Sequence, residues 1–135
     1  MKASRHLWLG AAAALAIVLW ASSAAALTEL VMYTQTTCPF CQRFEREIAP
    51  VYERTKEGRQ APLRRVELSA GGVRGAGLKE PVFATPTFVL MANGREAGRI
   101  TGYMNDDMFW GMLGRLLSGI ESTADQSQRP VPEKP

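Results

Sequence analysis

Cys38-Pro39-Phe40-Cys41 stands between a short apolar run, Leu30–Tyr33, and a segment in which apolar side chains recur at spacings of three and four. The apolar run predicts a buried strand over residues 28–35. Because proline is favoured at the first position of a helix, Pro39 predicts a helix that begins there, with Cys38 as its N-cap. The two cysteines are thus predicted at a strand–helix junction, at an edge of an α/β sheet where reactive and ligand-binding groups gather.

The spacing of the two cysteines points to chemistry. A disulfide across two intervening residues closes so short a loop that it constrains the unfolded chain little. At an N-cap, the Cys38 sulfur faces the unpaired N–H groups of the first helical turn, which favour the thiolate, the form that attacks disulfides. We therefore predict that Cys38 is the exposed nucleophile and that Cys41, deeper in the helix, is the resolving thiol.

Residues 1–26 have the pattern of a secretory signal peptide. Lys2 and Arg5 precede an apolar run, and the small residues that end at Ala26 offer a cleavage site. A retained membrane anchor is the alternative, but the apolar run is shorter than the roughly 20 residues of a spanning helix. We expect export of the chain and cleavage near Ala26.

The composition of the remaining chain suits one domain and excludes several classes of protein. The single histidine, His6, leaves with the signal peptide, so the mature chain has neither a Cys/His zinc site nor a Cys–His catalytic pair. Cys38 and Cys41 alone are an incomplete set of metal ligands, and we predict no metal. Without Lys2 and Arg5, fourteen basic residues lie scattered among thirteen acidic ones, which predicts no nucleic-acid partner.

Spacing and turn signals predict the next elements. The first helix runs to about Lys56, kinks at Pro50, which lacks an N–H, and is closed by Gly58. Further strands are predicted over residues 62–68, 87–91 and 96–100. The first of these runs parallel to the opening strand because a helix connects the two, and Asn93-Gly94 makes the last two a hairpin.

The C-terminal part is predicted as a helix followed by a tail. Asn105 can cap the helix, with acidic residues in its first turn. The glycine-rich residues 69–77 are predicted as loop. Residues 121–135 have no apolar face to bury and are predicted to be disordered. Together the elements predict an α/β domain over residues 27–120, a four-stranded mixed sheet flanked by helices.

The sequence resembles the thioredoxin/glutaredoxin superfamily in three respects. These are the order of its elements, the placement of Cys38-Pro39-Phe40-Cys41 and the stretch Thr85-Pro86-Thr87-Phe88. In that superfamily a cis-proline begins the third strand and faces the dithiol. The resemblance implies a thioredoxin-like fold, a cis Thr85–Pro86 bond and pairing of substrate with the backbone beside Pro86, although a trans proline is also tolerated at a strand start. Tyr103, near the expected dithiol edge, is predicted to contact substrate.

A closer resemblance covers nearly all of the mature domain and is to the periplasmic thioredoxins encoded with sulfur-oxidation (Sox) systems. It rests on residues 31–33, 38–41, 47–50, 57–66, 85–90, 102–103 and 109–117. The resemblance implies a periplasmic thiol–disulfide oxidoreductase that reduces disulfides on a Sox carrier protein. Its electrons would come from a membrane thiol carrier of the CcdA/DsbD type. We expect a monomer with no cofactor besides the redox-active disulfide Cys38–Cys41.

The sequence departs from ordinary thioredoxins in two places. Pro39-Phe40 between the cysteines is closer to glutaredoxins, and Met32 stands where thioredoxins bury a carboxylate. The proton acceptor for Cys41 is therefore open between water and Glu45.

Other functions also stay open at the sequence level. One is a non-catalytic thioredoxin-fold binding or regulatory module. Another is a glutaredoxin-like or Dsb-type general disulfide reductase or isomerase. Glutathione binding through Thr85 and residues 105–107 is a further alternative. However, the polar side chains of residues 105–107 are equally explained as the cap of the last helix.

Overall fold

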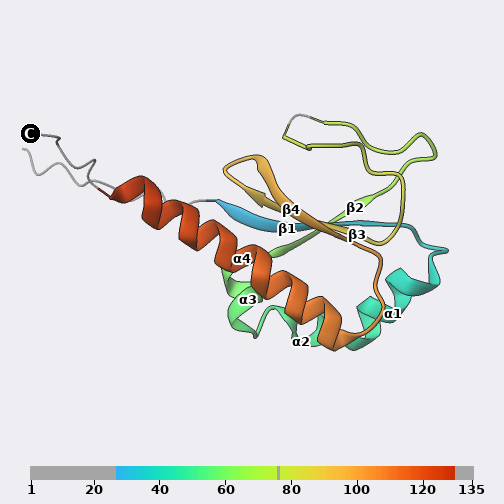
Figure 1. Ribbon diagram of the computed structural model, residues 1–135. Helices are drawn as coiled ribbons and strands as arrows, with labels where there is room; N and C mark the ends of the chain where they lie inside the picture. The colour runs from blue at the N-terminus through green and yellow to red at the C-terminus, as the bar shows by residue number, and fades with distance from the viewer. Residues whose placement is uncertain (1–26, 76, 130–135) are drawn as a thin grey trace, which may run out of the picture.

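In the described residues of this computed structural model, 27–75 and 77–129, four strands form one mixed sheet with four helices (Figure 1). The elements are β1 (Thr28–Thr34), α1 (Pro39–Glu47), α2 (Ala49–Tyr52), α3 (Lys56–Gln60), β2 (Leu63–Glu67), β3 (Thr87–Ala92), β4 (Arg95–Thr101) and α4 (Asp106–Gln128). The predicted signal peptide lies outside the described range, and within that range no helix has the length and apolar character needed to cross a membrane.

The sheet has the order β2–β1–β3–β4 and the predicted strand directions. β1 runs parallel to β2 and antiparallel to β3, with Val31 opposite Val89. β3 and β4 form a hairpin whose turn residues, Asn93 and Gly94, both have positive φ (52° and 74°). A two-residue hairpin turn of this kind needs a left-handed backbone at both positions, which Asn and Gly adopt most readily. The predicted α/β class and mixed four-stranded sheet are confirmed.

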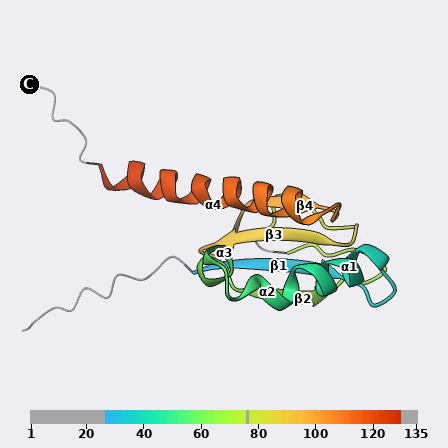
Figure 2. The ribbon, with the colours of Figure 1, turned by 90° about the horizontal axis from the view of Figure 1, so that it is seen from below.

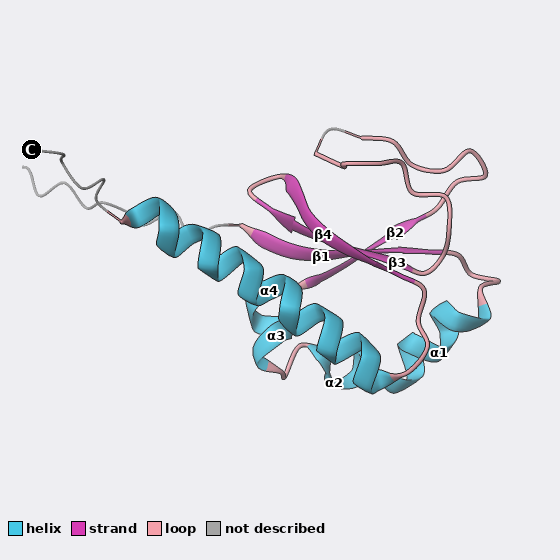
Figure 3. Cartoon of the chain, viewed as in Figure 1, coloured by secondary structure: helices cyan, strands magenta, loops and turns pink. Residues whose placement is uncertain are grey.

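The two faces of the sheet are covered differently. All four helices pack on one face, with α4 on the side of β4 and α1–α3 on the side of β1 and β2 (Figure 2). The other face is covered by loop residues 68–75 and 77–83, here called the covering segment (Figure 3). Because side chains alternate along a strand, Leu30 and Met32 face the helices, whereas Val31 and Tyr33 face the covering segment. The helices that flank the sheet therefore lie on one face of it.

The single helix predicted from Pro39 to about Lys56 is three short helices. α1 ends at Glu47, and Pro50 lies in the first turn of α2, where its missing N–H costs no intrahelical bond. Gly58, predicted to close the helix, lies within α3. The chain thus forms two helices, divided at Ile48 just before Pro50, where a kink in one helix was predicted.

The apolar face of the predicted helix nevertheless continues through these breaks. Phe44, Ile48 and Tyr52 are all buried in the core, whereas Val51, three residues after Ile48, is 40% exposed. Buried side chains one helical turn apart have the same spacing in the sequence whether or not the helix between them is interrupted. The spacing therefore does not reveal the break.

α4 is longer than predicted, and its C-terminal part projects beyond the sheet (Figure 1). Asn105 caps it, as predicted, by accepting the Met108 N–H at 2.9 Å. The prediction of disorder from residue 121 is wrong for residues 121–128, which are exposed but helical. Extending an existing helix adds a hydrogen bond without a new nucleation cost, so this end needs no apolar face. Residues 130–135 lie outside the described part.

Hydrogen bonds of Glu96, which is ion-paired with Arg99 of the same strand, fasten the covering segment to β4. Glu96, whose side chain is 2% exposed, accepts hydrogen bonds from Arg99 at 2.6 Å and from the Lys79 N–H at 2.9 Å. The Glu96 N–H donates to the Gly77 carbonyl at 2.7 Å. The hydrogen bonds from Arg99, with that from Lys79, hold the pKa of Glu96 below its ordinary value of 4.5, although burial acts in the opposite direction.

Replacing Glu96 with glutamine is expected to lower the free energy of unfolding at neutral pH by about 1.5–3 kcal/mol, the range for hydrogen bonds to charged groups. Because folding lowers the pKa of Glu96, its contribution is present above pH 4.5 and is lost as the pH falls through the folded-state pKa. Urea denaturation at neutral and acidic pH measures this, and the difference between Glu96→Gln and the wild type should shrink in acid. Glu67→Gln, which changes an exposed carboxylate of β2, is the control. Equal losses in the two variants would contradict the role of Glu96.

Candidate active site

The two cysteines lie at the turn from β1 into α1, as predicted. Cys38 is the N-cap of α1 with extended backbone (φ −78°, ψ 113°), and Pro39 begins the helix. The Cys38 sulfur accepts the Cys41 N–H at 3.1 Å. The two residues form a disulfide, with their Cα atoms 5.3 Å apart. The predicted capping contact is confirmed, and it supplies a donor that can stabilise a thiolate at Cys38.

Both cysteines are buried, but not equally. Cys38 is 8% exposed and Cys41 is 2% exposed. The predicted order of exposure is therefore confirmed, whereas the prediction of an exposed Cys38 is wrong. The exposed part of the motif is Pro39-Phe40, and Phe40 is 56% exposed. Pro39 and Phe40 are thus available to a partner at this edge, and Cys38 is less enclosed than Cys41.

Gln35 ties the turn that carries Cys38 to two other loops. The Cys38 N–H donates to the Gln35 carbonyl at 3.1 Å. The Gln35 side chain donates to the Leu68 carbonyl at 3.2 Å and accepts a hydrogen bond from the Thr85 hydroxyl at 3.3 Å. One residue thus connects the dithiol turn with the start of the covering segment and with the loop that precedes β3.

The Thr85–Pro86 bond is cis, as the resemblance to the thioredoxin/glutaredoxin superfamily implied. Pro86 is buried directly before β3, whose first residue, Thr87, pairs with Tyr33 near the end of β1. Pro86 therefore lies beside the stretch of chain that leads to Cys38. Thr85 is half-buried at the same edge.

Tyr103 has a different role from the predicted substrate contact. It is 3% exposed, and its ring packs edge-on against Phe44 with centroids 5.6 Å apart. Its hydroxyl donates to Glu47 at 2.7 Å. Burial, and then the hydrogen bond to Glu47, raise the pKa of Tyr103. A tyrosine is most stable where its ring packs and its hydroxyl finds an acceptor, and α1 supplies both.

Arg43 joins α1 to the segment between β4 and α4. Its guanidinium donates to Glu47 at 2.8 Å and to the Met104 carbonyl at 2.9 Å. The hydrogen bond from Arg43, followed by that from the Tyr103 hydroxyl, lowers the pKa of Glu47. The start of the same segment is held by the Pro86 carbonyl, which accepts a backbone N–H from residue 102 at 2.7 Å. The segment is thereby fixed against both α1 and the cis-proline loop, and Met104 remains 65% exposed.

The surroundings of Cys41 are apolar. Met32 is fully buried in the same core cluster as both cysteines. Glu45, one of the two predicted proton acceptors, instead accepts two hydrogen bonds from Arg65, at 2.6 and 2.8 Å. The Glu45 carboxylate is thus engaged by Arg65. Within the described residues, no group of three or more His, Cys, Asp or Glu side chains is placed to hold a metal ion.

Three polar residues of this site were not predicted: Gln35, Arg43 and Glu47. Each acts through a partner that is distant in sequence, such as Thr85 for Gln35 or Met104 for Arg43. Arg43 and Glu47 have the spacing of charged side chains on the solvent-exposed face of a helix. The sequence pattern therefore does not distinguish them from ordinary surface residues. A polar residue at the end of an apolar strand, directly before the cysteine turn, is the one signal that could have singled out Gln35.

Comparisons with known proteins agree with this geometry. A family model described as a thioredoxin-like domain matches residues 22–117, which include both cysteines and Pro86. The crystal structure of the periplasmic thioredoxin SoxS from Paracoccus pantotrophus, in its reduced form, is 44% identical in sequence with a TM-score of 0.63, and the match covers 69% of this chain and 98% of that chain.

Two further solved structures are more distant. A mutant thioredoxin from Halobacterium salinarum NRC-1 is 22% identical with a TM-score of 0.47, covering 68% of this chain and 76% of that chain. The thioredoxin Mala s 13 from Malassezia sympodialis is 20% identical with a TM-score of 0.48, covering 68% of this chain and 79% of that chain. A comparison with curated protein sequences gives no match.

Proposed function

This chain belongs to the thioredoxin-like family, and from that premise we propose that it is a periplasmic reductase of a sulfur-oxidation (Sox) carrier protein. Its activity is that of a thiol–disulfide oxidoreductase. The observation that carries the proposal is the 44% identity to the periplasmic thioredoxin SoxS over 98% of that chain. The secretory pattern of residues 1–26 supports the periplasmic location.

The arrangement of the two sulfurs supports a two-step reduction of a partner disulfide. The Cys38 thiolate, stabilised by the Cys41 N–H, attacks one sulfur of the partner, and the other partner sulfur leaves as a thiolate. The Cys41 thiolate then attacks the Cys38 sulfur, and the partner leaves fully reduced. Two electrons have passed to the partner, and Cys38 and Cys41 are joined in the disulfide that the structure contains.

Return to the dithiol requires two electrons from outside the protein. We assign this step to a membrane thiol carrier of the CcdA/DsbD type, which would attack the disulfide through the same exposed edge. The Cys38–Cys41 disulfide is then the single redox group, and the protein works as a monomer. The backbone beside Pro86 is the proposed pairing site for the partner segment that holds the attacked disulfide.

Substrate trapping tests the proposed partner. A Cys41→Ser variant keeps the attacking thiol but lacks the thiol that resolves the mixed disulfide. We expect it to accumulate a covalent complex with a Sox carrier protein in periplasm, released by a reducing agent and identified by mass spectrometry. A variant with both cysteines replaced by serine is the matched control and should trap nothing. Recovery of general disulfide-pathway clients without any sulfur-oxidation protein would refute the Sox assignment and leave the oxidoreductase activity standing.

A further inference from the structure

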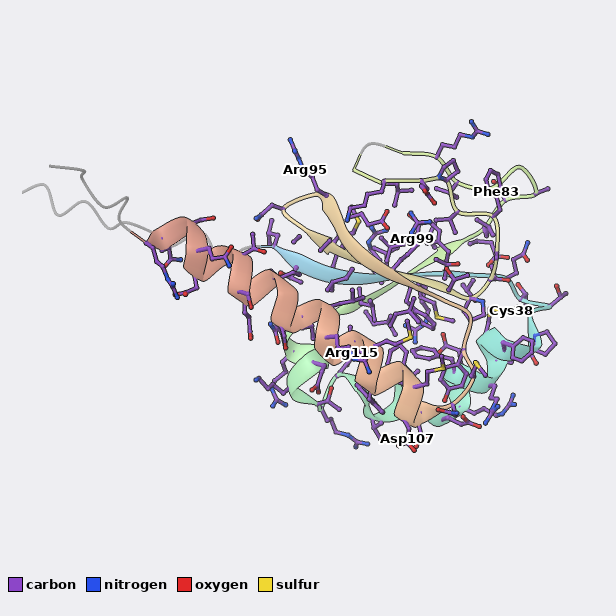
Figure 4. All side chains as sticks on the ribbon, viewed as in Figure 1. Cys38, Phe83, Arg95, Arg99, Asp107 and Arg115 are labelled. Atoms are coloured by element: carbon purple, nitrogen blue, oxygen red, sulfur yellow. A yellow bond between two sulfur atoms is a disulfide. The ribbon has the colours of Figure 1, made fainter. Side chains whose placement is uncertain are left out.

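Phe83, at the end of the covering segment, is a large aromatic side chain that stays 63% exposed. It lies two residues before Thr85, whose hydroxyl contacts Gln35 in the turn that carries Cys38. Figure 4 shows Phe83 and Cys38 at the same end of the molecule. An exposed ring therefore lies on the loop that leads to the cis-proline, and Gln35 connects that loop to the dithiol turn.

The Phe83 ring is held in place although it is exposed. Val73 and Val82 form a bridge through two backbone hydrogen bonds of 2.9 Å, which fixes the backbone next to Phe83. Gly72, with a positive φ of 75°, lies directly against the ring, and a Cβ at that position would overlap it. Preorganised side chains lose little freedom on binding, and aromatic anchors of this kind dominate many interfaces.

Arg74 adds a positive charge to the same place. Its guanidinium carbon lies 5.9 Å from the centroid of the Phe83 ring. The other charged side chains of the covering segment are Lys79 and Glu80, and the Lys79 amine donates to the Ala97 carbonyl at 3.3 Å. In the described part of the chain, the ion pairs do not involve Arg74. The guanidinium is thus free to meet an acidic group of a partner.

We propose that Phe83 and Arg74 form an anchor for protein substrates beside the dithiol. The occupant is an extended, disulfide-bearing segment of the substrate, with an apolar side chain against Phe83 and an acidic side chain against Arg74. The anchor is continuous with the cis-proline loop, where the same segment would pair, and its positive charge selects acidic substrates. The inference rests on the oxidoreductase activity of Cys38 and Cys41 and is independent of which carrier protein is the partner.

Peptide kinetics test the anchor. The probes are two synthetic peptides with an internal disulfide, one with Phe and Glu next to a cysteine and one with Gly and Lys, together with bis(2-hydroxyethyl) disulfide, a small disulfide without a ring or a charge. Phe83→Ala is expected to raise the KM for the Phe–Glu peptide about tenfold, as for loss of an aromatic anchor, with kcat and the rate with the small disulfide unchanged. Arg74→Gln is expected to reduce the preference for the Phe–Glu peptide about two- to fivefold at low salt, as for an exposed charge pair.

Two controls make the outcome decisive. Val51→Ala truncates an exposed apolar side chain on α2 and should leave all three rates unchanged. Phe83→Tyr keeps the ring and should restore the wild-type KM. An unchanged KM for the Phe–Glu peptide in Phe83→Ala would overturn the anchor. Failure to trap a Sox carrier protein would leave this peptide result intact, so the two proposals fail separately.

Discussion

Replacing Cys38 with serine is expected to reduce the rate of protein disulfide reduction to that of the uncatalysed reaction. Cys38 is the more exposed of the two residues and its sulfur accepts the Cys41 N–H at 3.1 Å, so it is the one expected to attack as a thiolate. A serine hydroxyl at this N-cap keeps the capping hydrogen bond but is a far weaker nucleophile. Insulin reduction in the presence of dithiothreitol, followed by turbidity, measures the loss.

Cys41→Ser is the matched variant for this experiment. It should also stop turnover, but after the first step, so that a mixed disulfide with the substrate accumulates and is seen by mass spectrometry. A Cys38→Ser variant that retains activity, or that forms the mixed disulfide through Cys41, would reverse the assigned roles. Partner binding that survives the loss of both thiols, together with an absence of turnover by the wild-type protein, would instead favour a binding module.

Replacing Phe44 with alanine is expected to lower the free energy of unfolding by about 3–5 kcal/mol, the range for truncating a buried phenylalanine. Phe44 is fully buried, and its ring contacts those of Phe88, Tyr103 and Phe109 at centroid distances of 4.7, 5.6 and 5.1 Å. The change would leave a cavity where α1, β3 and α4 meet. Guanidinium denaturation followed by circular dichroism measures the loss.

Phe40→Ala on the same helix is the control for this prediction. Phe40 is 56% exposed and lies within the active-site motif, so its truncation should change the stability by less than about 0.5 kcal/mol. A loss below about 1 kcal/mol in Phe44→Ala would show that the core closes around the cavity. Because Cys41 lies one helical turn before Phe44 in the same core, the packing that stabilises the fold also positions the dithiol.

Short-range chemistry explains the parts of the fold and site that could be predicted. Pro39 after Cys38 sets the start of α1, Asn93-Gly94 sets the hairpin, and Asn105 caps α4. Each of these signals acts within about four residues, and tertiary contacts do not compete with it. The resemblance to known sequences added the cis bond before Pro86, which spacing alone left open.

The predictions that differ from the structure concern features that depend on contacts between residues distant in sequence, or on where a helix is interrupted or ends. The helix is interrupted at Ile48, just before Pro50, yet the buried side chains on either side keep a helical spacing. The end of α4 is helical without an apolar face because helix propagation costs little once the helix exists. Tyr103 turned inward because Glu47 on α1 offers its hydroxyl an acceptor.

The sequence by itself determined that Cys38 caps the helix that contains Cys41, at the end of a buried strand, and so brought the two thiols together. The tertiary structure decided what surrounds that pair. Gln35, Arg43 and the covering segment are brought to the dithiol edge by contacts that span many residues, such as the 61 between Arg43 and Met104. Such contacts depend on how strands and helices pack, which no local pattern of residues encodes.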